Sequence, residues 1–341
     1  MRATILRPGG DVRVESVPDA RVEQPRDAVV RVCHAAVCGS DLWRYRDRTP
    51  AGPIRPGHEF VGVVEALGPD ATGLRVGQVV LAPFAWSDGA CEHCLAGLPT
   101  SCPAGAVFGD NADGAQAEAV RVRYADANLV PLPMDRDDSR LPAVLTLADV
   151  MSTGHHAATC ARVAPGATVA VIGDGAVGLC AAAAARRLGA AHVVVLSHHH
   201  ARGELARRLG ADTVVHERGP AAAERVRELT GGRGADAVLE CVGTAGSWAD
   251  ALATVRDGGA IGYVGLPHGV ALDPAAFFDR NLTLSGGIAP ARRYIPHLLP
   301  ELLSGSLDPS GVFDHRVGLA DVADAYRAMH TRTAVKALIT P

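Results

Sequence analysis

A glycine-rich turn between an apolar run and an alanine-rich run constrains this chain more than any other stretch. The hexapeptide Gly-Asp-Gly-Ala-Val-Gly occupies residues 173–178, after four apolar residues and before the alanine-rich stretch 180–189. Gly173 permits a tight strand-to-helix turn, Gly175 lets the backbone approach a pyrophosphate, and Gly178 lets the helix pack closely on a sheet. The N-terminus of that helix offers free N–H groups to the phosphates. The pattern predicts a dinucleotide-binding strand–turn–helix unit rather than a plain turn.

The chain changes its pattern on the two sides of this turn. With 341 residues, of which 48% are hydrophobic, it is long enough to bury two cores. Up to about residue 147, short alternating segments broken by glycine and proline predict an antiparallel, barrel-like domain. From about residue 157, strands and helices alternate, which predicts a doubly wound parallel sheet. We expect an α/β protein with a first domain over residues 1–156, a dinucleotide-binding domain over 157–290, and a C-terminal segment over 291–341 that returns to the first domain.

The individual elements follow from the same periodicities. The expected strands are 12–17, 28–37, 60–67 and 78–82 in the first domain, 168–172, 193–196, 213–215, 237–240, 260–264 and 282–285 in the second, and 335–339 at the end of the chain. Helices are expected at 293–304 and 320–330.

The charge and the N-terminus exclude some partners. The formal net charge is only −4, so the balance suggests neither nucleic acid nor an anionic membrane surface as partner. The first eight residues lack the apolar region of a signal peptide, and no run reaches the length of a membrane span. We expect a cytoplasmic protein that acts on a small molecule.

Cysteine, histidine and carboxylate residues recur in short motifs of the first domain. Cys91, Cys94 and Cys102 are clustered, and in a reducing compartment three thiols at such spacing indicate a metal site. Cys38 and His58 are also ligand types of zinc, but a buried cysteine and a core histidine are common, so their spacing alone favours packing.

Four motifs together suggest a family. Cys38-Gly39-Ser40-Asp41, Gly57-His58-Glu59, Ser152-Thr153-Gly154 and the glycine turn occur in this order. They resemble the zinc-dependent alcohol dehydrogenases of the medium-chain dehydrogenase/reductase superfamily, over essentially the whole chain. The resemblance implies a GroES-like, β-rich catalytic domain, a Rossmann domain inserted in it, a catalytic Zn²⁺, NAD or NADP as cofactor, and a homodimer or homotetramer.

The resemblance also implies roles for residues of the first domain. The catalytic zinc ligands would be Cys38, His58 and Asp149, the last standing where many relatives have cysteine. Glu59 would be the neighbouring carboxylate that binds or leaves the metal, and Asp41 would orient the ligand histidine. Ser40 would take the alcohol proton, while Trp43 stands where many relatives carry the histidine that ends a proton relay.

A structural zinc site is implied in a second cysteine-rich segment. Relatives carry four cysteines there, and three of those positions match Cys91, Cys94 and Cys102. The first position is Asp88, and a carboxylate oxygen is an acceptable zinc ligand. The alternative is an empty segment with three free thiols.

Selectivity between the two nicotinamide cofactors depends on the end of the second Rossmann strand, where an acid usually binds the ribose 2′-hydroxyl. No acid follows residues 193–196 here, and Ser197, His198 and Arg202 could instead hold a 2′-phosphate. This favours NADP over NAD; the alternative is a solvated polar loop. The full set of expected cofactor contacts is Gly173, Gly175, Ala176, Val177, Gly178, Ser197, His198, Arg202, Thr153, Val264, Gly265, Leu266 and Lys336.

These inferences indicate a zinc-dependent oxidoreductase that transfers a hydride between NAD(P) and an alcohol or carbonyl substrate, with Ser40 relaying the proton. A polyol, sugar or amino-alcohol dehydrogenase on the same scaffold is an alternative, because loop side chains alone separate these substrates. A nucleotide-binding protein without turnover, and a zinc-independent quinone reductase, conflict with the retained metal ligands.

Overall fold

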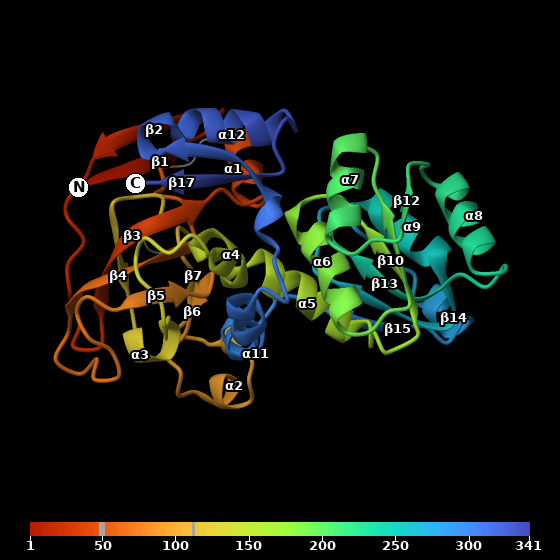
Figure 1. The fold of residues 1–341 in the computed structure, drawn as a ribbon, viewed down its shortest axis with the longest axis horizontal. Helices are drawn as coiled ribbons and strands as arrows, with labels where there is room; N and C mark the ends of the chain where they lie inside the picture. The colour runs from red at the N-terminus through yellow and green to blue at the C-terminus, as the bar shows by residue number, and fades with distance from the viewer. Residues whose placement is uncertain (48–51, 111–112) are drawn as a thin grey trace. The chain divides into compact units, whose positions relative to one another are not determined.

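The computed structural model describes residues 1–47, 52–110 and 113–341. These divide into two compact units: unit 1 comprises residues 1–149 and 290–341, and unit 2 comprises residues 150–289 (Figure 1). The division falls after Asp149 rather than at residue 156, because the helix that begins at Val150 packs against the helix and strands of unit 2.

Unit 1 is built on an antiparallel sheet with one parallel pair at its edge. Its strands run in the order β16-β17-β3-β4-β5-β9, β8 also pairs with β3, and β16 is parallel to β17. They are β3 (Ala28–Ala36), β4 (Phe60–Leu67), β5 (Val79–Ala82), β8 (Ala119–Val122), β9 (Val130–Pro131), β16 (Phe313–Gly318) and β17 (Lys336–Thr340). Two-stranded sheets are formed by β1 (Arg2–Arg7) with β2 (Asp11–Ser16) and by β6 (Ala85–Trp86) with β7 (Ala106–Val107).

Helices of unit 1 are mostly short. They are α1 (Asp41–Arg46), α2 (Glu92–Leu95), α3 (Ala125–Asn128), α4 (Leu141–Leu145), α11 (Ala291–Ser304) and α12 (Val322–His330), with 3₁₀ turns η1 (Pro99–Ser101), η2 (Thr146–Ala148), η3 (Ser310–Val312) and η4 (Leu319–Asp321). The C-terminal strand joins the sheet through Leu338 and Ile339, which pair with Ala36 and Ala35 of β3. The end of the chain is therefore part of the same core as its beginning.

Unit 2 is a six-stranded parallel sheet in the order β12-β11-β10-β13-β14-β15. Its elements are α5 (Val150–Cys160), β10 (Thr168–Ile172), α6 (Ala176–Arg187), β11 (His192–Leu196), α7 (His200–Arg208), β12 (Thr213–Val215), α8 (Pro220–Leu229), β13 (Ala235–Glu240), α9 (Ala245–Thr254), β14 (Val255–Tyr263), α10 (Pro274–Phe278) and β15 (Thr283–Gly286). In chain order the strands read 3-2-1-4-5-6, the Rossmann order, with its switch point between β10 and β13. The predicted α/β class is confirmed.

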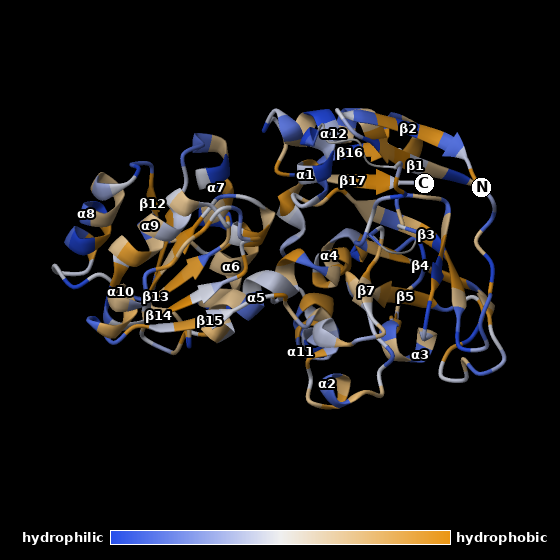
Figure 2. Cartoon of the chain, turned by 180° about the vertical axis from the view of Figure 1, so that it is seen from behind, coloured by the Kyte–Doolittle hydropathy of each residue, from blue (hydrophilic) through white to orange (hydrophobic). Residues whose placement is uncertain are grey.

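Apolar burial explains both units. The central strands β10 and β11 are buried along nearly their whole length, as expected for a parallel sheet covered on both faces. Helices α5 and α6 pack together, as do α8 and α9. Figure 2 shows hydrophobic residues concentrated in strands such as β13 and β17, and hydrophilic residues along α8. In α8 the residues that face inward are Ala222, Ala223 and Val226.

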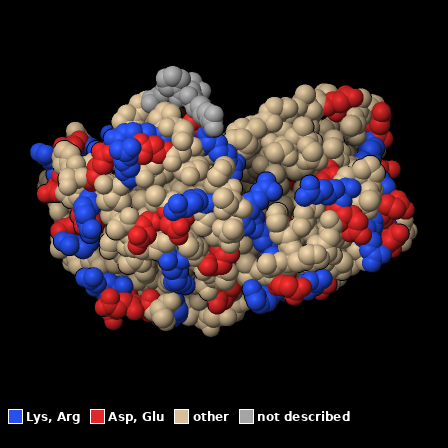
Figure 3. Space-filling view, turned by 90° about the horizontal axis from the view of Figure 1, so that it is seen from above, with Lys and Arg blue, Asp and Glu red and all other residues tan. Residues whose placement is uncertain are grey.

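Two features bear on possible partners. On the face drawn in Figure 3, positively and negatively charged side chains are interspersed, in keeping with the small net charge. Within the described residues, no helix combines the length and apolarity needed to cross a membrane.

Candidate functional site

Four buried side chains from distant segments of unit 1 converge. Cys38 follows β3, His58 and Glu59 precede β4, and Asp149 follows η2. One ligand atom from each lies within 4.8 Å of the others. Asp149 Oδ2 lies 3.4 Å from Cys38 Sγ and 3.4 Å from His58 Nε2. The arrangement therefore brings thiol, imidazole and carboxylate donors to one point.

Local backbone geometry sets this convergence. Gly57 has a φ of +112°, and a Cβ there would lie 2.5 Å from the backbone nitrogen of Gln116. Only glycine tolerates both the positive φ and the close approach. On the other side, the Phe84 N–H donates to the Ala148 carbonyl at 2.9 Å and anchors the turn that presents Asp149.

The electrostatics of the cluster favour a cation. Burial raises the pKa of the Cys38 thiol, and the Asp149 carboxylate raises it further. Burial alone would lower the pKa of His58, but the neighbouring thiol and carboxylates outweigh burial and raise it well above its ordinary value. A metal ion would satisfy the same demand for positive charge while leaving the imidazole neutral and the thiol ionised. The donor set is that of zinc.

Glu59 contributes an unused oxygen to this cluster. Its side chain is fully buried, and Oε1 lies 2.5 Å from the ammonium of Lys336, which also donates to the Val37 carbonyl at 3.2 Å. Glu59 Oε2 is buried and has no hydrogen-bond partner in the described part of the chain. A buried carboxylate oxygen without a partner is costly, so this atom fits a site for a metal ion.

Asp41 braces the cluster from outside. Asp41 Oδ1 lies 3.8 Å from His58 Nδ1, and Oδ2 accepts from the Cys38 N–H at 3.0 Å and from Gln116 Nε2 at 3.2 Å. The hydroxyl of Tyr326 donates in turn to Gln116 Oε1 at 3.0 Å. Sequence reasoning missed Gln116 and Tyr326, because neither lies near a motif.

A second group of possible ligands lies in one short segment. The donor atoms of this lobe cluster, Asp88, Cys91, Cys94 and Cys102, lie within 4.8 Å of one another. Hydrogen bonds from the backbone N–H groups of Ala90 and Cys91 hold the pKa of the Asp88 carboxyl well below its ordinary range. Burial raises the pKa of the Cys94 thiol to about 11, so a thiolate there needs a neighbouring cation. These donors also fit zinc.

The glycine turn of unit 2 has the geometry of a phosphate cradle. Gly173 has a φ of +114°, and a Cβ on Gly178 would lie 2.1 Å from the Gly173 carbonyl oxygen. Gly175 precedes α6, and a Cβ there would meet no atom of the described residues within 4 Å. Ala176 and Val177 open the helix, so their N–H groups lie in its first turn. The space beside Gly175 and the helix N-terminus suit a pyrophosphate.

Comparisons with known proteins show which family the chain belongs to. The model described as "Alcohol dehydrogenase GroES-like domain" matches residues 24–134, and the model described as "Zinc-binding dehydrogenase" matches residues 176–304. A probable zinc-binding alcohol dehydrogenase of Mycobacterium tuberculosis is 36% identical over 339 residues, which cover 98% of this chain and 86% of that protein. The chain belongs to the zinc-dependent alcohol dehydrogenases. It is thus an oxidoreductase that acts on CH–OH groups.

Two further relatives support the assignment to this alcohol dehydrogenase family. An alcohol dehydrogenase of Cupriavidus necator is 33% identical over 348 residues, covering 96% of this chain and 94% of that protein. The structure of alcohol dehydrogenase TADH from Thermus sp. ATN1 matches with a TM-score of 0.93 at 35% identity, covering 100% of this chain and 99% of that one. The resemblance drawn from the four sequence motifs is confirmed.

Three further residues that the dehydrogenase family suggested lie in unit 1. Ser40 is exposed and directly precedes α1, and Trp43, on the first turn of that helix, is 40% exposed. Lys336, expected near the cofactor, is buried and paired with Glu59.

Several expected cofactor residues lie near the carboxyl ends of unit 2 strands. Val264 and Gly265 follow β14, and both N–H groups donate to the Glu240 carbonyl, at 2.9 and 3.2 Å. Leu266, the next residue, is 55% exposed. Thr153 lies buried in α5, which begins at Val150. The carboxyl ends of parallel strands are where such sheets bind ligands.

The residues expected to bind a 2′-phosphate are not all together. Ser197 and Arg202 contact Asp174, the second residue of the glycine turn, whereas His198 Nδ1 faces the His216 carbonyl at 3.3 Å. His199, which the sequence gave no reason to single out, joins the first group, with Nδ1 2.8 Å from Asp174 Oδ2. The acid in the glycine hexapeptide was the signal that could have identified this contact.

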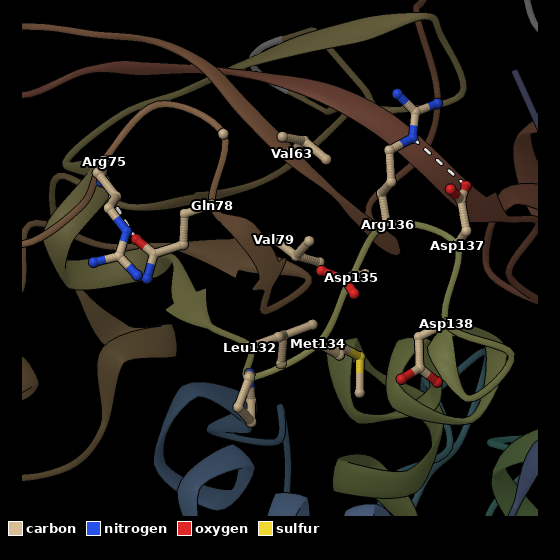
Figure 4. Close-up of a pocket in the computed structure, with 12 residues that line it drawn as sticks. Val63, Arg75, Gln78, Val79, Leu132, Met134, Asp135, Arg136, Asp137 and Asp138 are labelled. Atoms are coloured by element: carbon tan, nitrogen blue, oxygen red, sulfur yellow. Dashed lines mark hydrogen bonds and ion pairs between the residues drawn. The ribbon is translucent and has the colours of Figure 1, made fainter.

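A hollow elsewhere in unit 1 is separate from both metal-ligand clusters. Its volume is about 890 Å³, and Arg75, Gln78, Asp135 and Arg136 are among its lining residues (Figure 4). None of the lining residues belongs to either cluster. We therefore assign it no part in the dehydrogenase reaction.

Proposed function

We propose that Cys38, His58 and Asp149 hold the catalytic zinc of this dehydrogenase, and that Glu59 binds or leaves the metal during turnover. The observation that carries the proposal is the buried convergence of these four side chains, with Glu59 Oε2 lacking a partner among the described residues. Three protein ligands leave one position for substrate, as catalytic zinc sites require.

A bound zinc would supply Lewis acidity toward the substrate oxygen, and a bound nicotinamide would supply the redox chemistry of hydride transfer. The chain's own residues hold the components and move the proton. Asp41 fixes the orientation of His58. The Lys336 ammonium holds Glu59 in place and opposes the rise that burial causes in the pKa of its carboxyl group. Ser40 takes the proton of the alcohol during oxidation and returns it during carbonyl reduction.

Proton exit from Ser40 does not use a terminal histidine. The corresponding position is occupied by Trp43, which has no titratable group. Because Ser40 is exposed in unit 1, the proton passes to water or to a cofactor hydroxyl.

The lobe cluster holds the structural zinc in this proposal. Asp88 replaces the first cysteine of the family pattern, and three thiolates supply the remaining ligands. Three reduced thiols at ligand distance have little other use in a cytoplasmic enzyme.

The cofactor is a nicotinamide dinucleotide bound along the glycine turn. The sequence-based preference for NADP relied on the lack of an acid after β11, and the contacts of Asp174 weigh against it. We also propose a homodimer or homotetramer in the cytoplasm, on the strength of the family resemblance; light scattering of the purified protein tests the assembly.

The test of this function is nicotinamide absorbance with NAD and NADP over a panel of primary and secondary alcohols, polyols and amino alcohols, in both directions. Turnover should disappear on chelation and return with zinc. Turnover that survives removal of all metal would contradict the zinc mechanism and indicate zinc-independent reduction. Cofactor binding without turnover on any alcohol or carbonyl would support a binding protein instead.

A further inference from the structure

An acid lies beside the second Rossmann strand although none follows it in the sequence. In dinucleotide-binding sheets, an acid about 20 residues beyond the glycine motif binds the adenosine ribose 2′-hydroxyl. Ser197, the residue after β11, occupies that position, and its hydroxyl donates to Asp174 Oδ2 at 2.9 Å. The carboxylate thus comes from the glycine turn but lies one hydrogen bond from the usual place of the ribose-binding acid.

The carboxylate of Asp174 is held by three partners from the segment after β11. Oδ2 is 2.8 Å from His199 Nδ1 as well as near Ser197, and Oδ1 is 3.4 Å from Arg202 Nη1. Only 13% of the Asp174 side chain is exposed, and the same fraction of the Arg202 side chain. The acid is therefore positioned and largely shielded from water, which strengthens its electrostatic effect.

The Asp174 carboxylate is ionised at neutral pH. Burial by itself raises the pKa of this carboxyl group, but the hydrogen bonds from His199 and Ser197 and the charge of Arg202 outweigh burial and lower the pKa below its ordinary value. The charge of Arg202 is thereby largely compensated before any cofactor arrives.

A 2′-phosphate would meet this compensated pair rather than a free cation. It brings nearly two negative charges at neutral pH, and like charges repel strongly when they are brought together in a shielded site. His198 does not relieve this cost, because its ring faces the His216 carbonyl. A ribose with a free 2′-hydroxyl can instead donate a hydrogen bond to the carboxylate.

We infer that Asp174 is a specificity-determining residue that accepts a hydrogen bond from the adenosine ribose 2′-hydroxyl and repels a 2′-phosphate, so that the enzyme selects NAD over NADP. The inference rests on the proposed nicotinamide-linked function. It assigns to the glycine turn a discrimination that is usually made at the end of the second strand.

A purely structural role for Asp174 makes a different prediction. If the carboxylate only stabilised the turn, its loss would weaken the binding of both dinucleotides by the same factor. The ratio of the two dissociation constants separates the two roles, because only the 2′-substituent distinguishes NADPH from NADH.

The experiment is a fluorescence titration of the zinc-loaded protein with NADH and NADPH, without substrate. The parent should bind NADH at least about tenfold more tightly than NADPH, a difference that one repulsive charge contact readily supplies. Asp174→Asn, which removes the charge but keeps the shape, should lower that ratio at least about tenfold, and Asp174→Ser should do the same. The matched control is Glu224→Gln on α8, an equal charge change at an exposed surface pair, which should keep the parental ratio.

A parent that prefers NADPH, or a ratio unchanged in both Asp174 variants, overturns the inference while leaving the dehydrogenase intact. Failure of the parent to bind either dinucleotide overturns the proposed function as well. If the Asp174 variants fold poorly in thermal melts, ADP-ribose and its 2′-phosphorylated form are titrated into the parent. A parent that holds the phosphorylated probe as tightly as the plain one contradicts the inference.

Discussion

The two clusters of candidate metal ligands in unit 1 use similar donor atoms but are built in different ways. The lobe cluster comes from the single stretch 88–102, and only Cys102 among its four residues is fully buried. The cluster around Cys38 and Asp149 joins three segments, and all four of its residues are buried. A local cluster can hold its metal by its own turns, whereas the assembled one depends on the fold around it. We therefore expect the first to affect stability and the second to affect chemistry.

We expect the largest difference between the two clusters, in kcat, from Cys38→Ala. Loss of a catalytic zinc ligand should lower kcat by at least about 1,000-fold, because Lewis-acid stabilisation of alkoxide is worth several kcal/mol. Metal analysis should show one zinc lost per chain and the lobe zinc retained. NADH affinity should remain near the parental value, and full activity in the variant would exclude Cys38 as a ligand.

Lys336→Met tests how far the assembled cluster depends on its support. Lys336 is the only lysine in the chain, and its ammonium is buried against Glu59. Removal of one partner from a buried ion pair should lower the free energy of unfolding by about 3 kcal/mol, measured in urea. Addition of Glu59→Gln should recover part of that loss. A decrease below about 1 kcal/mol would contradict the buried pairing.

Asp41→Asn should have a smaller effect that is confined to the catalytic metal. The amide keeps the shape of the side chain but weakens the hold on His58, so zinc affinity or kcat should fall by about 10- to 100-fold. Competition with a chromogenic chelator measures the affinity. Equal loosening of both zinc ions would show that Asp41 acts on the fold of unit 1 in general.

Loss of a ligand from the lobe cluster should affect metal content and stability rather than kcat. Asp88→Asn retains an acceptor for the Ala90 and Cys91 N–H groups, whereas Asp88→Cys restores the family's four thiols. The first should release zinc and lower the melting temperature by about 5 °C, with kcat per folded, catalytically loaded site nearly unchanged. The second should retain the metal. Full zinc content in Asp88→Asn would remove Asp88 from the ligand set.

Local patterns account for most of what could be predicted. The glycine hexapeptide, the cysteine spacing and the change from short alternating segments to strand–helix alternation each depend on neighbours in sequence, so they predicted both units and the candidate donors. Sequence periodicity does not predict contacts between residues that are far apart in the chain. Tyr326 is linked to Asp41 by hydrogen bonds through Gln116, and Lys336 pairs with Glu59, which lies 277 residues earlier. The direction of these side chains depends on how β17 and α12 pack on the rest of unit 1.

By itself, the sequence determined the fold class, the place of the glycine turn that we propose holds the phosphates, and the residue types able to bind zinc. These follow from backbone needs and donor chemistry within short segments. Only the tertiary structure decided that Lys336 forms an ion pair with Glu59, and that the other oxygen of Glu59 has no hydrogen-bond partner in the described chain. The tertiary structure also decided that the carboxylate of Asp174 contacts Ser197, His199 and Arg202. The physical reason is that electrostatic interactions depend on distance in space and not on separation in sequence. The packing of β10 beside β11 places the carboxylate of Asp174 next to the segment that follows β11.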